Sequence, residues 1–161
     1  MAQQAKPKVI GHSDDFRAQR KSCSTVVTAK FGFASLASGN SCRSQMAEGL
    51  ARKAESQWEV FSAGLLPAGY VSEGAITAME KIGIDISTQQ SKGLDEVNLD
   101  AMDVIVSLGE FPTTDFVARP EGKVTEDWNI PDPMGHTIEF FEIARDQIEM
   151  KIRELKRHLA T

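Results

Sequence analysis

Several features that mark large classes of protein are missing from this sequence. It contains only two cysteines, Cys23 and Cys42, which cannot build a disulfide framework and which predict free thiols in a reducing cytosol. No apolar run approaches the roughly 20 residues that cross a lipid bilayer. The first residues also lack the apolar core of a signal peptide. We therefore expect a cytoplasmic protein that does not insert into a membrane.

Charge and motif content exclude further classes. The net charge of −5 disfavours binding to nucleic acid and to anionic membranes. The three histidines, His12, His136 and His158, lack the spacing of metal ligands, and the phosphate-binding motif that ends in Gly-Lys-Ser/Thr is absent. We therefore expect neither a metal nor a cofactor. Any bound anion must be held by local geometry, because the overall field repels it.

The order of apolar patterns predicts the fold. With 161 residues, of which 41% are hydrophobic and 25% charged, the chain fits one soluble domain. Strands are predicted at residues 31–36, 58–64, 102–108 and 124–128, and helices at residues 46–54, 72–82, 94–99 and 137–159. This alternation indicates an α/β fold, a three-layer, four-stranded parallel sheet with helices on both faces. Sites in such sheets lie beyond the carboxyl ends of the strands.

Local signals add detail to these elements. Residues 31–36 make a poor buried strand, because Gly32 and Ser35 interrupt the apolar run. Ser41 and Ser72 are predicted to cap the helices that follow them.

A small polar loop at residues 36–45 opens the first of these helices. Gly39 and Asn40 tolerate the left-handed backbone of a tight turn. A loop that opens a helix directs unpaired main-chain N–H groups toward one point, where the helix dipole also favours an anion. Arg43 adds a permanent charge and a planar fork that can hold two oxygens. The sequence therefore predicts an oxyanion-binding loop.

The loop resembles the active-site loop of the low-molecular-weight protein tyrosine phosphatases and of the arsenate reductases that share their fold. Their signature is Cys, five residues, Arg and Ser, commonly with Gly-Asn-Ser-Cys inside it. Here the position six residues before Arg43 holds Ala37, so the resemblance implies that the nucleophilic thiolate is replaced by a methyl group. The residues that the resemblance implies for oxyanion binding are Ser38, Gly39, Asn40, Ser41, Cys42, Arg43 and Ser44.

Two further side chains are candidates for the chemistry. The resemblance implies that Asp132, in a late Asp-Pro loop, is the general acid that protonates the leaving oxygen. From the residues alone, a carboxylate before proline could simply begin a turn. Cys42 could replace the missing nucleophile, because helix N-termini lower the pKa of a thiol. We favour a buried structural thiol at this position.

Other residues point to the thioredoxin-coupled arsenate reductase branch of this family. Residues 45–49 and 126–128 are similar to that branch, and the aromatic pair that phosphatases often carry after Asp-Pro is absent. The resemblance covers residues 39–159 and implies arsenate, phosphate or sulfate as the ligand and a thioredoxin-type reductant as the partner. The redox cysteines of that branch are missing, since Gly109 and Glu110 stand where one is expected.

The N-terminal part departs from the family pattern. Residues 8–10 look like the start of the family's first strand, but about two dozen unfamiliar residues separate them from the loop. We expect a single domain over residues 1–161, with residues 1–23 as a flexible or atypical arm. We hypothesise that an insertion, a frameshift or a mistaken gene model placed a foreign segment within residues 11–36.

Two functions follow from this sequence. The first is an arsenate reductase or small phosphatase-like protein, with a role in arsenic detoxification, that binds an oxyanion in residues 37–44 but is impaired or inactive because of Ala37. The alternative is a non-catalytic oxyanion- or partner-binding protein that keeps the phosphatase fold.

Overall fold

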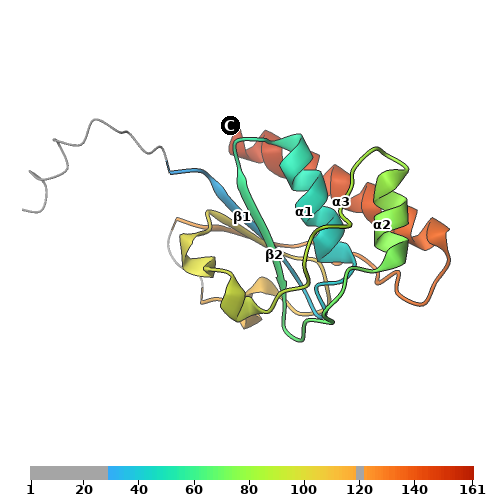
Figure 1. Ribbon diagram of the computed structural model, residues 1–161. Helices are drawn as coiled ribbons and strands as arrows, with labels where there is room; N and C mark the ends of the chain where they lie inside the picture. The colour runs from blue at the N-terminus through green and yellow to red at the C-terminus, as the bar shows by residue number, and fades with distance from the viewer. Residues whose placement is uncertain (1–28, 119–121) are drawn as a thin grey trace, which may run out of the picture.

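The computed structural model describes residues 29–118 and 122–161 (Figure 1). The predicted arm at residues 1–23, the strand start at residues 8–10, Cys23 and His12 lie outside the described residues. The predicted single domain therefore stays a prediction for the N-terminal part of the chain.

A four-stranded parallel sheet forms the centre of the fold. Its strands are β1 (Gly32–Ala37), β2 (Glu59–Gly64), β3 (Val104–Ser107) and β4 (Val124–Asp127). They lie in the order β2-β1-β3-β4, and every neighbouring pair is parallel. All four carboxyl ends therefore lie along one edge of the sheet, and the residues that follow the central strand β1 lie in the middle of that edge.

Strand β1 corrects the prediction that residues 31–36 form a poor buried strand. All six of its residues are buried between its two neighbours. A Cβ at Gly32 would lie 3.1 Å from the Ala101 carbonyl oxygen, so a small residue is needed there. The hydroxyl of Ser35 donates a hydrogen bond of 3.0 Å to the Ser44 carbonyl. The two residues that interrupt the apolar pattern thus fit the packing of the strand.

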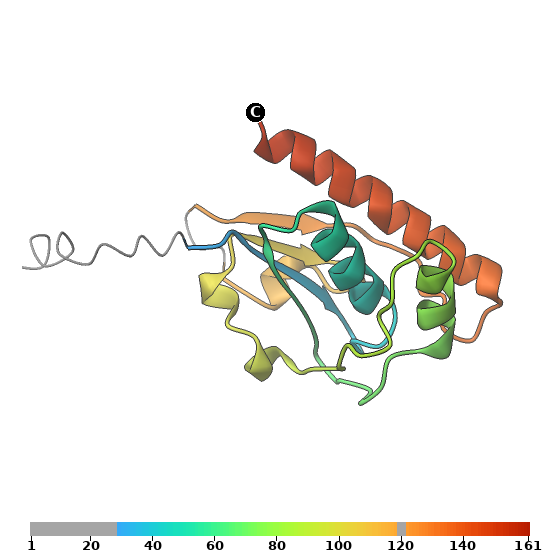
Figure 2. The same ribbon diagram turned by 45° about the horizontal axis from the view of Figure 1, so that its top comes forward.

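Three α-helices, α1 (Arg43–Ala54), α2 (Glu73–Glu80) and α3 (Ile138–Leu159), cover one face of the sheet (Figures 1 and 2). They share a core that includes Phe33, Met46 and Ile148. Gly74 allows α2 to approach α3, because a Cβ there would lie 2.5 Å from the ring of Phe141. No helix in the described ranges is both long enough and apolar enough to cross a membrane.

The opposite face is covered by short 3₁₀-helices, η2 (Leu94–Glu96), η3 (Leu99–Ala101) and η4 (Thr113–Asp115). A smaller core lies beneath them, with Leu36 and Ile105 fully buried. The predicted three-layer α/β fold with a four-stranded parallel sheet is therefore confirmed. Its second face carries 3₁₀-turns in place of longer helices.

The two predicted serine caps have different outcomes. The prediction for Ser41 is wrong, because the N-cap residue of α1 is Cys42. Ser72 is the N-cap residue of α2, as predicted, but its side chain makes no capping hydrogen bond. These two serines instead join the helix starts through their main chains, because Ser72 N–H donates to the Ser41 carbonyl over 2.8 Å. The contact ties the beginning of α2 to the loop that precedes α1.

Candidate functional site

The loop between β1 and α1 borders a cavity of about 200 Å³ at the carboxyl edge of the sheet. The cavity is lined by Ala37, Ser38, Gly39, Asn40, Ser41, Cys42, Arg43, Asp132 and Met134. The structure thus brings together all but one of the residues selected from the sequence. The exception is Ser44, which is fully buried behind the loop.

The main-chain carbonyls of this loop bond to the protein outside the cavity. Those of Ser38, Gly39 and Ser41 accept hydrogen bonds of 2.8–2.9 Å from main-chain N–H groups of residues 66–72. The Asn40 main-chain carbonyl accepts a hydrogen bond of 3.0 Å from the side-chain Nε2 of Gln45. Within the described residues, no protein oxygen accepts a hydrogen bond from the N–H groups of residues 39–43.

These carbonyl contacts fix the direction of the free N–H groups. In a trans peptide unit the carbonyl oxygen and the following N–H point in opposite directions, and the described chain has no cis peptide bond. Because the carbonyls of residues 38–41 bond to other parts of the chain, the N–H groups that follow them point away from those partners. They form an unpaired set of donors along the cavity wall, ahead of the helix that starts at Arg43.

Asn40 holds the shape of the loop. Its φ of 45° lies in the left-handed region, as predicted, whereas Gly39 does not adopt a positive φ, so that part of the prediction is wrong. The side-chain amide of Asn40 donates to the Ser44 hydroxyl over 2.9 Å. Its oxygen accepts bonds from the amide of Gln45 at 3.0 Å and from the Lys92 main chain at 2.6 Å.

Gly64, the last residue of β2, leaves the space in which the loop sits. A Cβ at this position would lie 2.8 Å from both the Asn40 nitrogen and the Ser38 carbonyl oxygen. Both contacts are to main-chain atoms, which cannot swing away as a flexible side chain could. The close approach of β2 to the loop therefore requires glycine.

Arg43 is buried, with 7% of its surface exposed. Its Nη1 donates to the carbonyl of Ile130 over 2.7 Å and is 3.4 Å from that of Leu108. Its Nη2 lies 3.7 Å from Oδ2 of Asp132. Among the described residues, Nε makes no hydrogen bond to a protein oxygen, so the guanidinium keeps donors for a ligand in the cavity that it lines.

Asp132 stands across the cavity from this guanidinium and reaches solvent, with about half of its side chain exposed. Its Oδ1 accepts a hydrogen bond of 3.1 Å from the Met134 main chain. The sequence left open whether this carboxylate begins a turn or serves as an acid at the site. The structure shows the turn contact and also places the carboxylate in the cavity wall.

Ala37 ends β1 and forms part of the cavity wall. It is 95% buried, with a relative exposure of 5%. The hydroxyl of Ser44, on the first turn of α1, accepts the hydrogen bond from the Asn40 side chain.

Cys42 is a buried thiol. It belongs to the core below the helices and has 5% of its surface exposed. The pKa of this thiol is raised from 9.0 to about 12, chiefly by burial and next by the nearby Asp132 carboxylate. The hydrogen bond with Ser72 and the charge of Arg43 act in the opposite direction and lower it. A thiol with this pKa is protonated at neutral pH and is a poor nucleophile.

The raised pKa of Cys42 predicts a pH effect on stability. Between pH 9 and about 12 the unfolded chain loses this thiol proton while the folded chain keeps it, so the free energy of unfolding should fall as the pH rises through this window. Urea unfolding between pH 8 and 11 would measure it, with Cys42→Ala compared against the parent chain, both carrying Cys23→Ser. Parallel stability curves for the two proteins would contradict the assignment.

Sequence reasoning missed an ionic cluster around the buried carboxylate of Glu48. Glu48 has 2% of its surface exposed and accepts a hydrogen bond from the Ser62 hydroxyl. Its two oxygens lie 2.6 Å from Arg52 Nη2 and 3.5 Å from Lys92 Nζ. The main-chain N–H of Lys92 also donates a hydrogen bond to the side-chain oxygen of Asn40. Lys92 therefore connects the ionic cluster to the 37–44 loop. The sequence does hold one signal for this cluster: Glu48 is a charged residue on the face of α1 whose other residues are buried.

The remaining candidates lie elsewhere. His136 packs its ring 4.6 Å from Phe140, and no group of three potential metal ligands occurs in the described ranges. Asp127, the last residue of β4, accepts a hydrogen bond of 2.7 Å from the Thr113 main chain. It therefore fastens η4 to the end of β4.

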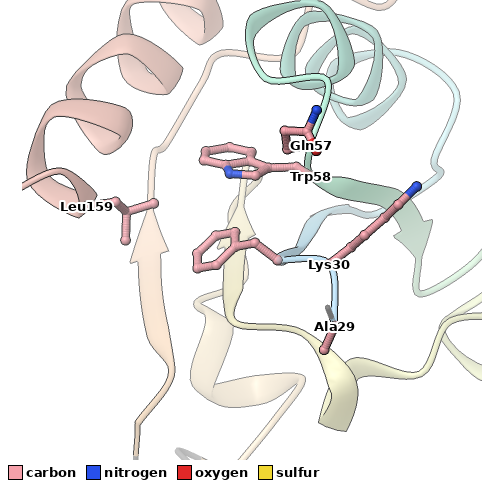
Figure 3. A pocket seen from close by; sticks show the side chains of 6 residues that line it. Ala29, Lys30, Gln57, Trp58 and Leu159 are labelled. Carbon is pink, nitrogen blue, oxygen red and sulfur yellow. The ribbon is translucent and has the colours of Figure 1, made fainter. Parts of the chain in front are cut away.

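A second, more open cavity of about 400 Å³ lies at the amino end of β1 (Figure 3). Its walls are residues 29–31, Gln57, Trp58 and Leu159, and the rings of Phe31 and Trp58 are 5.3 Å apart. Because the 37–44 loop follows the carboxyl end of the same strand, this cavity is separate from the candidate site.

Comparison with known proteins identifies the family. Arsenate reductase 2 of Staphylococcus haemolyticus is 37% identical over 122 residues, which make up 75% of this chain and 92% of that protein. The solved structure of an arsenate reductase in the phosphate-binding state superposes with a TM-score of 0.68 and 35% identity, covering 78% of this chain and 95% of that one.

More distant structures share the fold. The Wzb protein of Vibrio vulnificus, solved in complex with benzylphosphonate, superposes with a TM-score of 0.66 at 20% identity and covers 80% of this chain and 99% of its own. Residues 33–161 match the family described as low molecular weight phosphotyrosine protein phosphatase. The chain therefore belongs to the low molecular weight phosphotyrosine protein phosphatase family, in which it is similar to arsenate reductases.

Proposed function

We propose that the 37–44 loop binds a tetrahedral oxyanion, arsenate, phosphate or sulfate, and that the chain turns it over slowly or not at all. The observation that carries this proposal is a single cavity wall containing free main-chain N–H groups, a buried guanidinium and the methyl group of Ala37. Donors fixed in this way suit an anion with several oxygens.

The methyl group of Ala37 affects binding and turnover in opposite ways. A thiolate at this position would attack the bound anion but would also repel it, because both are negative. A methyl group removes the attacking atom and the repulsion together. Affinity for the anion is therefore kept while covalent chemistry is lost.

The similarity to arsenate reductases raises the question of whether this chain has the thiols that arsenate reduction needs. Arsenate reduction requires a thiol to attack arsenic and a second thiol to resolve the product, with a thioredoxin-type protein as the terminal reductant in the branch that this chain resembles. Cys42 is buried and protonated, and Gly109 and Glu110 follow β3 without a thiol. These features support the non-catalytic alternative, an oxyanion-binding protein that keeps the fold of an enzyme.

Replacing Arg43 tests the binding proposal. Arg43→Ala should weaken phosphate binding about 10- to 100-fold, because charge-assisted hydrogen bonds to the anion are lost. Arg43→Lys should recover part of the affinity, since it restores the charge without the planar fork. Isothermal titration with phosphate and arsenate measures the affinities, and circular dichroism checks that the variants fold.

The matched control is Arg153→Ala, because this exposed arginine on α3 lies outside the cavity. It should bind phosphate like the unaltered chain. Equal phosphate affinities for the chain and for folded Arg43→Ala would refute the proposal.

A further inference from the structure

A small apolar cavity lies behind the Asp132 loop, on the side facing α3. Its volume is about 150 Å³. The lining residues are Pro131, Asp132, Pro133, Phe140, Ile143, Ala144 and Gln147. Phe140 and Ile143 on its rim leave 50% and 54% of their surfaces exposed, so the cavity is open to a ligand from solvent. The established contacts of the oxyanion loop do not involve these side chains.

Few polar atoms in the wall of this cavity are available to a ligand. Both oxygens of Asp132 have other neighbours, since Oδ1 accepts the Met134 N–H and Oδ2 lies 3.7 Å from Arg43. Gln147 is exposed and supplies one amide for a hydrogen bond. The ring of Phe140 packs against His136 at 4.6 Å, which holds one wall in place. The lining therefore suits a neutral ring with a single polar substituent.

Size narrows the ligand further. An enclosed, engineered apolar cavity of about 150 Å³ binds benzene, so the present cavity, which has a similar volume but is open to solvent, has room for one ring. We propose that the cavity at Pro131–Gln147 binds a neutral ring of the size of phenol, and that its occupancy weakens oxyanion binding through Asp132. The second half of this statement rests on the proposed function, whereas the first half does not.

The coupling follows from Asp132, which lines both cavities. A ring packed against Pro131 and Pro133 restrains the loop that carries this carboxylate. The carboxylate lies 3.7 Å from Arg43 Nη2 without a ring, and a bound ring would keep it there, where it competes with an anion for the guanidinium. Reciprocity requires that phosphate weaken ring binding by the same factor.

Methyl NMR of the whole chain tests ring binding directly. Phenol should shift the methyl signals of Ile143 and Ala144 saturably, with a Kd on the order of 1 mM, as expected for a ligand of this size. Ile143→Asp should weaken binding at least tenfold by placing a charge at the rim. Met150→Asp is the matched control, because Met150 is 60% exposed on the same helix and does not line the cavity.

Phosphate titration with and without saturating phenol tests the coupling, and the phosphate Kd should rise at least twofold. Absence of saturable shifts, or equal loss of binding in Ile143→Asp and Met150→Asp, would overturn the ring site. Concentration-dependent self-association that both variants abolish would assign the cavity to a second copy of the chain and overturn it as well. An unchanged phosphate Kd would overturn the coupling, whereas failure of phosphate to bind at all would refute the proposed function and leave the ring result standing.

Discussion

The Ala37→Cys variant is expected to hydrolyse p-nitrophenyl phosphate at least about 100-fold faster than the unaltered chain. A thiol at the end of β1 would share the cavity wall with the free N–H groups and with Arg43. Unpaired N–H groups and a nearby guanidinium both lower the pKa of a thiol, so this one should be a thiolate at neutral pH. Steady-state rates between pH 5 and 8 measure the effect.

Two further variants test whether the faster hydrolysis expected of Ala37→Cys comes from the thiol itself. Ala37→Ser has a similar size but a much weaker nucleophile, and it should stay near the rate of the unaltered chain. Adding Asp132→Asn to Ala37→Cys should reduce the rate about 10²- to 10⁴-fold if Asp132 is the general acid. A folded Ala37→Cys protein that binds phosphate but does not hydrolyse the ester would contradict the view that only the nucleophile is missing.

Gly64→Ala is expected to destabilise the protein by about 1–3 kcal/mol and to abolish measurable phosphate binding. The added methyl group would lie 2.8 Å from the Asn40 nitrogen and the Ser38 carbonyl oxygen, so the loop must move. Any such movement changes the direction of the N–H groups that we propose hold the anion. Urea denaturation and phosphate titration measure the two effects.

Gly39→Ala is the control for this substitution, although Gly39 stands inside the loop itself. A Cβ there meets nothing nearer than the Ser41 hydroxyl at 3.7 Å, which is ordinary contact, and its φ is not positive. Stability should therefore change by less than about 1 kcal/mol, with phosphate affinity retained. If Gly39→Ala were as damaging as Gly64→Ala, the steric account of Gly64 would be wrong.

The sequence predicts best those strands and helices that have a long, regular pattern of apolar residues. The buried run at residues 102–108 contains β3, and the apolar period ending at Leu159 gives α3, because long periodic segments leave few alternatives. Strand β1 was undervalued because Gly32 and Ser35 fit neighbours that lie far away in the sequence. Local patterns carry no information on such partners.

Some residues of the candidate site can also be located from the sequence, and others cannot. The loop and Asp132 can be located from the sequence because the loop motif is contiguous and the Asp-Pro pair stands in a recognisable late loop. Gly64, Lys92 and Glu48 could not, since each acts through a contact that only the folded chain creates. Ser41 shows the limit of a local rule, because the helix begins one residue later than its capping preference predicts, with Cys42 at the N-cap.

The anchoring of Arg43 links ligand affinity to the assembly of the whole domain. Its Nη1 bonds to the carbonyl of Ile130, 87 positions away along the chain, so the guanidinium is oriented only after the C-terminal half has docked. If the site binds an anion as we propose, binding therefore favours the fully assembled state over partly folded ones. Phosphate should raise the thermal midpoint as its concentration exceeds Kd, and a truncated chain ending before Ile130 should gain nothing from it.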